Sequence, residues 1–317
     1  MPQTTLNLEL GTLNCYAIIV SEGKMSITVD ESKCNGCMVC LEVCPLGNFE
    51  EFEGKVRGSD KGIACFACGH CVAMCPTGAM AHSDLAPSLF EELDERTRPT
   101  YEQLLQLLKA RRSRREFTDQ AVPKDIIEKL LAAAVQAPSS INNQSVRYTV
   151  VTDREIIKQL SDGSAKFLKQ FIHMMKSPLW RTFFKLSAHT QFDSYQELLP
   201  IAEILFEYQK AGRDAILYDP PCVIFLHAPK FDAFAPDDAI FNAENILLAA
   251  ETLGLGACVI GFASEPMNRN PAMKALVGMP KDHKVFCAIV LGYPKFKYRS
   301  SVPKNPPIIH YVENTGV

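Results

Sequence analysis

The stretch CNGCMVCLEVCP, residues 34–45, returns about 30 residues later as CFACGHCVAMCP, residues 65–76. Both stretches space their cysteines as C-x2-C-x2-C-x3-C-P, and together they hold eight of the twelve cysteines of the chain. Three thiolates at this tight spacing bind one cube of iron and sulfide, and the cysteine before the proline reaches across to another. The spacing therefore predicts iron–sulfur clusters, and the repeat predicts a duplicated module.

Zinc sites and disulfide bonds are the two other uses of such cysteines. Paired Cys-x-x-Cys units can form a tetrahedral zinc site, but zinc needs four ligands and gains nothing from the third and fourth spacings. Disulfide bonds need an oxidising compartment, and no secretory signal is visible in the sequence. The cluster interpretation is therefore favoured over both.

The two cysteine runs resemble those of the two-cluster bacterial ferredoxins, in which the fourth cysteine of each run binds the cluster of the other run. This resemblance implies a first [4Fe–4S] cluster, and its ligands are Cys34, Cys37, Cys40 and Cys75. It implies a second [4Fe–4S] cluster, and its ligands are Cys65, Cys68, Cys71 and Cys44.

Composition limits the possible partners and locations. The chain has 317 residues, enough for two domains, and 47% of them are hydrophobic. No apolar run approaches the roughly 18 residues of a membrane-spanning helix. The net charge of −3 argues against nucleic acid or an anionic membrane surface as a partner. Reduced thiols and iron–sulfur clusters together predict a cytoplasmic protein.

Four segments are expected along the chain. Residues 1–24 are interpreted as an N-terminal extension, with Met25 as the start of either the translated or the folded protein. Residues 25–85 are predicted to form the two-cluster ferredoxin domain, residues 86–99 a linker, and residues 100–317 a second domain.

The second domain alternates helical and strand patterns, which predicts an α+β or α/β fold and not a helical bundle. Thr100 and Gln103 form a capping-box signal for one helix, and Pro123 opens another. The predicted strands are residues 146–151, 222–226, 257–262 and 285–291, and further helices are predicted over residues 239–253, 270–277 and within 155–217.

Three stretches of this domain carry more particular chemistry. They are RRSRREF at residues 111–117, APSSINNQ at residues 137–144 and GLGACVIGF at residues 254–262. Taken singly, the first is typical of a solvated or anion-binding patch, the second of a loop, and the third of a helix end that leads into a core strand.

Taken together, the order and separation of the three stretches resemble the nitroreductase family of FMN proteins. The resemblance covers about residues 100–300, and the closing LGYP at residues 291–294 also fits it. It implies a nitroreductase-like α+β domain that binds FMN. The implied FMN contacts are Arg111, Arg112, Ser113, Arg115, Pro138, Ser139, Ser140, Asn142, Gln144, Val259, Ile260, Gly261, Lys297 and Arg299.

The resemblance also implies a role for parts of this set. Arg111 and Ser113 would bind the phosphate and ribityl tail, with Lys297 or Arg299 closing on the phosphate. Arg115 would lie near the N1/O2 edge, where positive charge stabilises the reduced flavin. The backbone of residues 259–261 would pass the ring and offer an N–H group to N5.

The stretch from Pro138 to Gln144 matches the family segment that reaches the flavin of the partner subunit. The resemblance therefore implies an obligate homodimer with FMN at its interface. No side-chain nucleophile is needed for flavin chemistry, so no catalytic residue is predicted.

Two classes of function remain open on the sequence. In the first, two clusters pass electrons from an external donor, ferredoxin or NAD(P)H, to FMN, which reduces a small organic acceptor by ping-pong turnover. Nitroaromatics, quinones and activated alkenes are the acceptors considered, with reductive dehalogenation or ring fragmentation as further chemistry of such enzymes. In the second, the protein is an electron-transfer or redox-sensing module that docks onto a partner protein.

Overall fold

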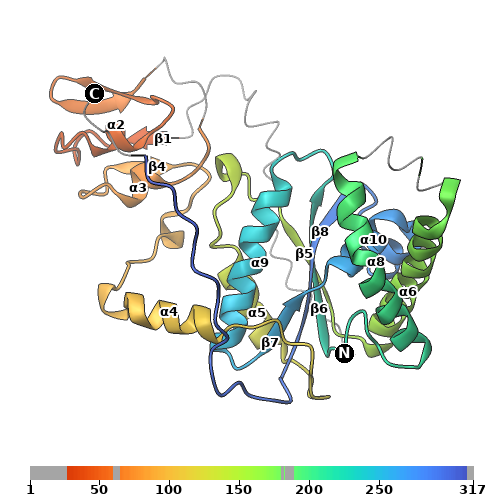
Figure 1. The fold of residues 1–317 in the computed structure, drawn as a ribbon. Helices are drawn as coiled ribbons and strands as arrows, with labels where there is room; N and C mark the ends of the chain where they lie inside the picture. Colours follow the sequence, from red (N-terminus) through yellow and green to blue (C-terminus); the bar gives the residue numbers. More distant parts are fainter. Residues whose placement is uncertain (1–26, 60–64, 180–181, 183–188, 313–317) are drawn as a thin grey trace, which may run out of the picture. The chain divides into compact units, whose positions relative to one another are not determined.

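The computed structural model describes residues 27–59, 65–179, 182 and 189–312 (Figure 1). The predicted extension over residues 1–24 lies outside these ranges. The chain divides into two compact units. One, the cysteine unit, contains the described residues up to Arg98 and the separate segment Pro138–Gln144. The other, the sheet unit, contains Pro99–Ala137 and the chain from Ser145 onward.

The cysteine unit is built from two similar halves, each with a short helix after its cysteine turn. Its elements are β1 (Ile27–Val29), α2 (Val39–Val43), β2 (Phe49–Phe52), β3 (Lys55–Gly58), α3 (His70–Ala73) and β4 (Met80–His82). Strand β1 pairs with β4 and β2 pairs with β3, both antiparallel. Ile27, Phe49, Val56 and Met80 pack around the buried thiols of this unit. A core this small depends on bound cofactors for much of its stability.

The chain leaves the cysteine unit through two 3-10 turns, η1 (Pro87–Leu89) and η2 (Glu95–Thr97), and enters helix α4 (Tyr101–Ala110). The predicted capping box at the start of α4 is confirmed. The Gln103 N–H donates to the Thr100 hydroxyl, and the Gln103 side chain accepts from the Thr100 N–H.

The sheet unit is a four-stranded sheet with helices on both faces (Figure 1). Its strands are β5 (Arg147–Val151), β6 (Cys222–Pro229), β7 (Gly256–Val259) and β8 (His283–Gly292), in the spatial order β5-β6-β8-β7 and antiparallel throughout. Its other helices are α5 (Lys124–Ala134), α6 (Arg154–Lys176), α8 (His189–Lys210), α9 (Ala235–Thr252), α10 (Gly261–Arg269) and α11 (Pro271–Leu276).

Alternation along the central strands builds one core on each face of the sheet. In β6, Ile224 and Leu226 pack with α5 and α9, whereas Val223 and Phe225 pack with α6 and α10. Successive residues of a strand point to opposite faces, so an unbroken apolar run such as Cys222–Leu226 belongs in a sheet covered on both sides. Helices lie accordingly on both sides of the sheet in Figure 1.

The predicted strand over residues 257–262 is wrong in its second half. Strand β7 ends at Val259, and Gly261 begins α10. The Ile260 N–H still donates to the Ala288 carbonyl of β8 at 2.8 Å, while the Ile260 carbonyl accepts from the Ala263 N–H at 3.2 Å. An apolar run spanning a strand end and a helix start has no period that separates the two.

Helix α9 starts at Ala235, four residues before the position predicted from its apolar pattern. Pro236 lies in its first turn, followed by Asp237 and Asp238, which favour a helix N-terminus. Within the described residues no helix is both long enough and apolar enough to cross a bilayer.

A histidine pair links β6 and β8, with His227 buried and His283 half-buried. His227 Nδ1 lies 2.8 Å from His283 Nδ1, and His227 Nε2 lies 2.9 Å from the Thr149 hydroxyl. Burial, together with the nearby His283, Arg147 and Lys274, lowers the pKa of His227 to about 4. The pKa of His283 is also lowered, mainly by burial.

Acid is therefore expected to destabilise the sheet unit through His227. Between about pH 6.5 and 4 the unfolded chain binds a proton that the folded protein excludes, so the free energy of unfolding falls as the pH falls. The loss for His227 is on the order of 3 kcal/mol at pH 4. Urea unfolding gives the free energy of unfolding at each pH in this range. This free energy should depend less on pH in His227→Gln than in the wild type, whereas substitution of the exposed His70 by Gln should leave the wild-type pH dependence. Equal pH profiles for all three proteins would contradict the expectation.

Candidate functional site

The eight cysteines of the two runs occupy matching environments. The second cysteine of each run, Cys37 or Cys68, is exposed, and the third, Cys40 or Cys71, is buried. The first and fourth of each run are half-buried. The duplication seen in the sequence is therefore a duplication of local structure. No group of three or more His, Cys, Asp or Glu side chains in the described chain is arranged around a single metal ion.

The fourth cysteine of each run lies among the other three of the opposite run. Burial raises the pKa of the Cys40 thiol, and the neighbouring thiols of Cys37, Cys34 and Cys75 raise it further. Cys75 comes from the second run, so thiols of both runs are neighbours in the first predicted ligand set.

The second set is assembled in the same way. Burial raises the pKa of Cys71 to about 11, with Cys65, Cys68 and Cys44 adding to the effect. Thiols with raised pKa values are protonated at neutral pH and must lose their protons to bind iron. The chemistry of the donor set, four thiols per group, fits an iron–sulfur cluster.

His82 is a site residue that the sequence did not reveal. Its Nδ1 accepts the Asp84 N–H at 3.1 Å, so the neutral ring carries its proton on Nε2. Nε2 lies 3.4 Å from Cys65 Sγ and donates to it. Burial lowers the pKa of His82, which keeps the ring neutral. In the first ligand set, Cys75 Sγ accepts the Ala79 N–H at 3.2 Å.

The arginine run lies against two other predicted stretches of the sheet unit. Ser113 forms a parallel bridge with Ala257 of β7, and the Arg114 N–H donates to the Ala257 carbonyl at 3.0 Å. Phe117 forms an antiparallel bridge with Pro294. The segments 111–117, 254–262 and 291–299, far apart in the sequence, are therefore brought together.

The arginines of this run have different surroundings. Arg111 is half-buried, and its Nε lies 3.5 Å from the Glu244 carboxylate of α9 without a hydrogen-bond partner in the described chain. Arg112 is half-buried, whereas Ser113 and Arg115 are exposed. Lys297 and Arg299, from the C-terminal side, are also exposed.

Arg114 is the buried member of the run and is not one of the predicted FMN contacts. Its Nη1 donates to the Phe296 carbonyl at 2.8 Å, and its guanidinium lies 4.0 Å from the Tyr298 ring centroid. A Cβ on Gly256 would come within 2.7 Å of the Arg114 Cβ, so this glycine makes room for the arginine. Arg114 anchors the C-terminal segment to the sheet unit.

Arg114→Ala is expected to destabilise the sheet unit by about 2–3 kcal/mol, because a buried charge-assisted hydrogen bond and its packing are lost. Chemical denaturation followed by circular dichroism measures this. The matched control is Arg269→Ala, which removes an exposed pair with Glu265 on α10 and a contact 6.0 Å from the Phe167 ring centroid, and it should change stability by about 0.5 kcal/mol or less. Equal losses in the two variants would contradict the structural role of Arg114.

Arg115 lies at the wall of a large cavity of the sheet unit, whose volume is about 1520 Å³. Its guanidinium lies 5.7 Å from the Tyr218 ring centroid. Val259, Ile260 and Gly261 line the same cavity. Burial raises the pKa of Tyr218, and the positive charge of Arg115 opposes that rise. Four of the predicted FMN contacts thus share one cavity.

Gly261 is placed to offer a backbone donor there. It is the first residue of α10, and the first N–H groups of a helix have no acceptor within the helix. The Ile260 N–H, in contrast, is already bonded to Ala288. The Gly261 N–H is therefore a suitable donor for this role, and the Ile260 N–H is not.

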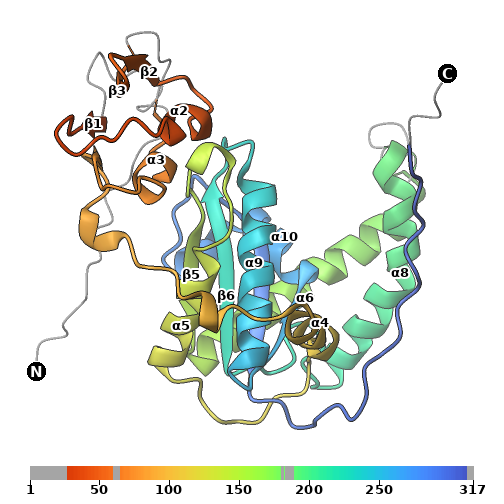
Figure 2. The ribbon, with the colours of Figure 1, turned by 90° about the vertical axis from the view of Figure 1, so that its left-hand side faces the viewer.

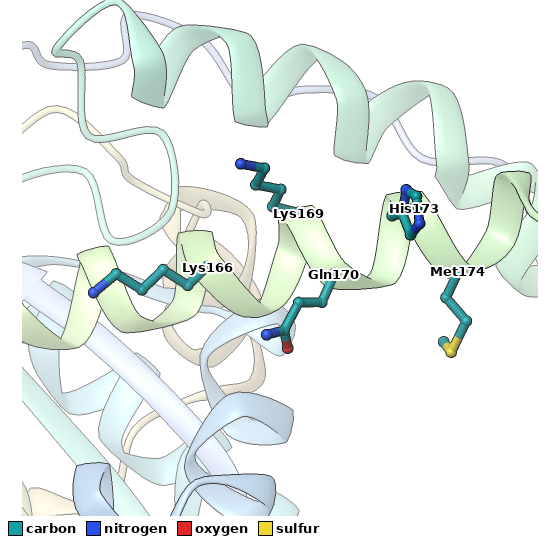
Figure 3. A pocket seen from close by; sticks show the side chains of 5 residues that line it. All are labelled: Lys166, Lys169, Gln170, His173 and Met174. Atoms are coloured by element: carbon teal, nitrogen blue, oxygen red, sulfur yellow. The ribbon is translucent and has the colours of Figure 1, made fainter.

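The opposite wall of the cavity comes from helices that carried no recognisable motif. It is mainly apolar, and its apolar members include Phe167, Leu168, Phe171, Met174, Met175, Leu198, Ile201, Leu205, Met273 and Leu276. Figure 3 shows the α6 residues beside a smaller hollow of about 590 Å³, where Gln170 and Met174 point away from Lys169 and His173. Lys166, Gln170 and Met174 also line the large cavity.

The remaining predicted FMN contacts lie in the cysteine unit. They are Pro138, Ser139, Ser140, Asn142 and Gln144. The Gln144 N–H donates to the Ser139 hydroxyl at 3.1 Å, and the Asn142 side chain donates to backbone of the second cysteine run. None of the five lines the large cavity.

Tyr218 and Glu244 are neighbours of the arginine run that sequence reasoning missed. Tyr218 has φ 68°, in the left-handed region, just before Asp219-Pro220-Pro221. The prolines mark a turn, but nothing local says that the turn meets Arg115. Glu244 lies on a helix about 130 residues from Arg111, so only the tertiary fold pairs them.

Known protein families match both units. A 4Fe-4S dicluster domain model matches residues 33–80, and the nitroreductase family model matches residues 108–293. A protein of Archaeoglobus fulgidus named an NADH dehydrogenase/NAD(P)H nitroreductase is 28% identical over 216 residues, which cover 66% of this chain and 97% of that protein. Nitrobenzene nitroreductase of Ectopseudomonas oleovorans is 26% identical over 226 residues, which cover 68% of this chain and 95% of that protein.

Among solved structures, an FMN-bound nitroreductase from Desulfitobacterium hafniense has a TM-score of 0.49 and 22% identity, covering 66% of this chain and 97% of its own. The nitroreductase family model spans more than half of the chain and follows the dicluster match in order. The chain therefore belongs to the nitroreductase family of flavin oxidoreductases and carries a 4Fe-4S dicluster ferredoxin domain before its nitroreductase domain.

Proposed function

We propose that the protein is an FMN-dependent oxidoreductase in which two [4Fe–4S] clusters supply electrons for the reduction of a small organic acceptor. The observation that carries this is the 1520 Å³ cavity, which joins Arg115 and Gly261 to an apolar wall from α6 and α8. FMN supplies two-electron reduction of an acceptor stacked on its ring, collecting electrons that arrive singly.

The residues of the sheet unit fit the parts of FMN. Arg111 has a buried Nε without a hydrogen-bond partner in the described chain, which suits the phosphate. Arg112, Ser113, Lys297 and Arg299 complete the proposed phosphate and ribityl site. Arg115 supplies positive charge for the pyrimidine edge, and the Gly261 N–H suits N5.

The cavity wall supports small planar acceptors such as nitroaromatics, quinones and activated alkenes. Phe167 and Phe171 offer faces for stacking, and Leu198, Ile201 and Leu205 exclude water. The named activity of the Ectopseudomonas oleovorans relative, nitrobenzene reduction, supports the nitroaromatic class for this chain.

The ferredoxin domain is part of the same chain as the nitroreductase domain. This arrangement supports electron supply through the clusters, because tethering raises the effective concentration of the donor at the flavin. The external donor is a reduced ferredoxin or NAD(P)H. Both are encountered in the cytoplasm, where thiols stay reduced. Acceptor and donor take turns at the flavin, which gives ping-pong kinetics.

Anaerobic analysis of the purified protein tests the cofactor set. About eight iron atoms and one FMN per chain are expected. The reduced protein should then be reoxidised by a nitroaromatic or quinone with saturable kinetics, and double-reciprocal plots should be parallel. Reoxidation that never saturates with a small acceptor, yet accelerates with a partner protein, would favour an electron-transfer or redox-sensing module instead.

We also propose that the protein is a homodimer with FMN at its interface. Up to Val312, where the described chain stops, the C-terminal segment after β8 has no helix or strand (Figure 2). Its Ile308, Ile309, Tyr311 and Val312 are exposed, as are Ile240 and Phe241 of α9. Exposed apolar side chains of this kind suit a subunit interface. Sedimentation should find an FMN-loaded dimer, and a flavin-loaded monomer would contradict the proposal.

A further inference from the structure

The segment Pro138–Gln144 belongs to the cysteine unit by packing, although the residues on either side belong to the sheet unit. It follows α5, which ends at Ala134, and precedes β5, which begins at Arg147. Seven residues therefore leave one unit and return to it, and they form a covalent link between the two. These are also the residues for which the nitroreductase resemblance implies contact with FMN.

Asn142 fastens this segment to the loop that holds the second cluster. Its Nδ2 donates to the Phe66 carbonyl at 3.1 Å and to the Ala67 carbonyl at 2.9 Å. Both carbonyls lie between Cys65 and Cys68. Its Oδ1 accepts from the Gln144 side chain at 3.0 Å. Carbonyl groups only accept hydrogen bonds, so the amide has one orientation. We call this pair of bonds to residues 66 and 67 the Asn142 clamp.

Backbone strain lies on both sides of the clamp. Ala67 has φ 49°, and Ile141, Asn142 and Gln144 have φ of 49°, 56° and 49°. This left-handed conformation is uncommon outside glycine and is an outlier for a β-branched residue such as Ile141. Such residues persist where surrounding interactions hold them, and they gather at functional sites. The clamp supplies those interactions here.

The first cluster has no equivalent clamp in the described chain. In the repeat, Asn35 and Gly36 correspond to Phe66 and Ala67. A Cβ on Gly36 would come within 2.2 Å of the Gly54 carbonyl, which lies between β2 and β3. The loop of the first cluster is therefore covered by a hairpin of its own unit, whereas the loop of the second is bound by residues 138–144.

We propose that the second cluster is the one that passes electrons to the flavin, and that the Asn142 clamp positions it to do so. The inference rests on the proposed function. In each step the reduced second cluster is oxidised by one electron, which the flavin gains. Two such steps, with protons from water, reduce one FMN fully. The external donor then reduces the second cluster again, with the electron passing through the first cluster. Asn142 is a positioning residue, because it acts through the cluster loop.

A substitution of His82 tests the role of the second cluster independently of Asn142. Its Nε2–H donates to Cys65 Sγ, and hydrogen bonds to cluster sulfurs raise the reduction potential. His82→Leu should lower the potential of one cluster only. If that cluster is the donor to the flavin, its electron occupancy falls and flavin reduction slows with it.

The test uses the full-length protein loaded with clusters and FMN, mixed anaerobically with reduced methyl viologen in a stopped-flow instrument. Asn142→Ala should slow flavin reduction about tenfold, from the loss of two hydrogen bonds. Its iron content and both cluster EPR signals should remain, and the rate is measured per bound FMN, because residues 138–144 are also predicted FMN contacts. The matched control Asn35→Ala removes an amide that accepts the Cys37 N–H at the first cluster, and it should keep the wild-type rate.

A wild-type rate for Asn142→Ala, or a slowing confined to Asn35→Ala, overturns the inference. If Asn142→Ala loses iron, His82→Leu decides: a lowered cluster potential with an unchanged flavin rate overturns the inference, and the two falling together supports it. Wild-type protein whose clusters are reduced while its flavin stays oxidised would instead overturn the proposed function, and this inference with it.

Discussion

Cys68→Ala is expected to slow electron supply to the flavin about a hundredfold while leaving FMN bound. Cys68 is an exposed thiol of the second ligand set, and its loss removes one of four ligands to that cluster. Without the tethered donor, the flavin depends on collisions with donor in solution. An effective concentration near 1 mM is then replaced by a donor at about 10 µM, a loss of about a hundredfold.

Stopped-flow reduction by a reduced ferredoxin measures this loss, with the flavin absorbance giving the FMN content. Cys222→Ala is the matched control, because Cys222 is a buried cysteine of the sheet unit and belongs to neither cysteine run. It should keep the wild-type rate and all of its iron. Flavin reduction at the wild-type rate in Cys68→Ala would show that electrons reach FMN without the second cluster.

Arg115→Ala is expected to give the second large effect, a fall in turnover of about a hundredfold or more. Arg115 is the one arginine of the run that lines the cavity. The reduced flavin is an anion, and removing a preorganised positive group beside developing charge typically costs that much. The midpoint potential of the bound FMN should become more negative, which anaerobic spectroelectrochemistry measures directly.

Two further variants separate charge from geometry. Arg115→Lys keeps the positive charge but loses the planar fork, so its potential should lie between those of wild type and Arg115→Ala. Arg213→Ala is the matched control, since Arg213 also covers a tyrosine ring, with 5.0 Å to the Tyr208 centroid, yet does not line the cavity. An unchanged potential in Arg115→Ala would contradict the proposed place of Arg115.

Local signals in the sequence predicted a good part of this fold. The capping box of Thr100 and Gln103 is confirmed because both partners lie within one helical turn. The strands around Val223 and Val290 were predicted because uninterrupted apolar runs suit a sheet covered on both faces. The repeat of the cysteine spacing likewise gave two matching thiol groups, since short-range geometry decides them.

What the sequence did not reveal depends on contacts between distant segments. The break at Ile260 follows from its carbonyl, which accepts the Ala263 N–H of α10, and an apolar run does not encode this bond. Arg114 differs from Arg115 only because one side chain meets Gly256 and Phe296 and the other faces a cavity. In the letters RRSRREF the two positions are equivalent.

The same limit applies to the segment at residues 138–144. Its small polar side chains predicted a loop, and the family resemblance predicted flavin contacts. Neither indicated that Asn142 would bond to carbonyls about 75 residues earlier in the chain. A side-chain amide can serve many acceptors, so its choice is set by tertiary structure alone.

Because the cysteine unit is discontinuous in sequence, its completion has an order during synthesis. A nascent chain that has reached Arg98 already contains both cysteine runs, but it lacks the seven residues that end at Gln144. Clusters can therefore be inserted before Asn142 is available to bond to the loop between Cys65 and Cys68. The last bonds of the ferredoxin domain form only after α5 has been translated. Completion of the ferredoxin domain therefore depends on synthesis of part of the nitroreductase domain.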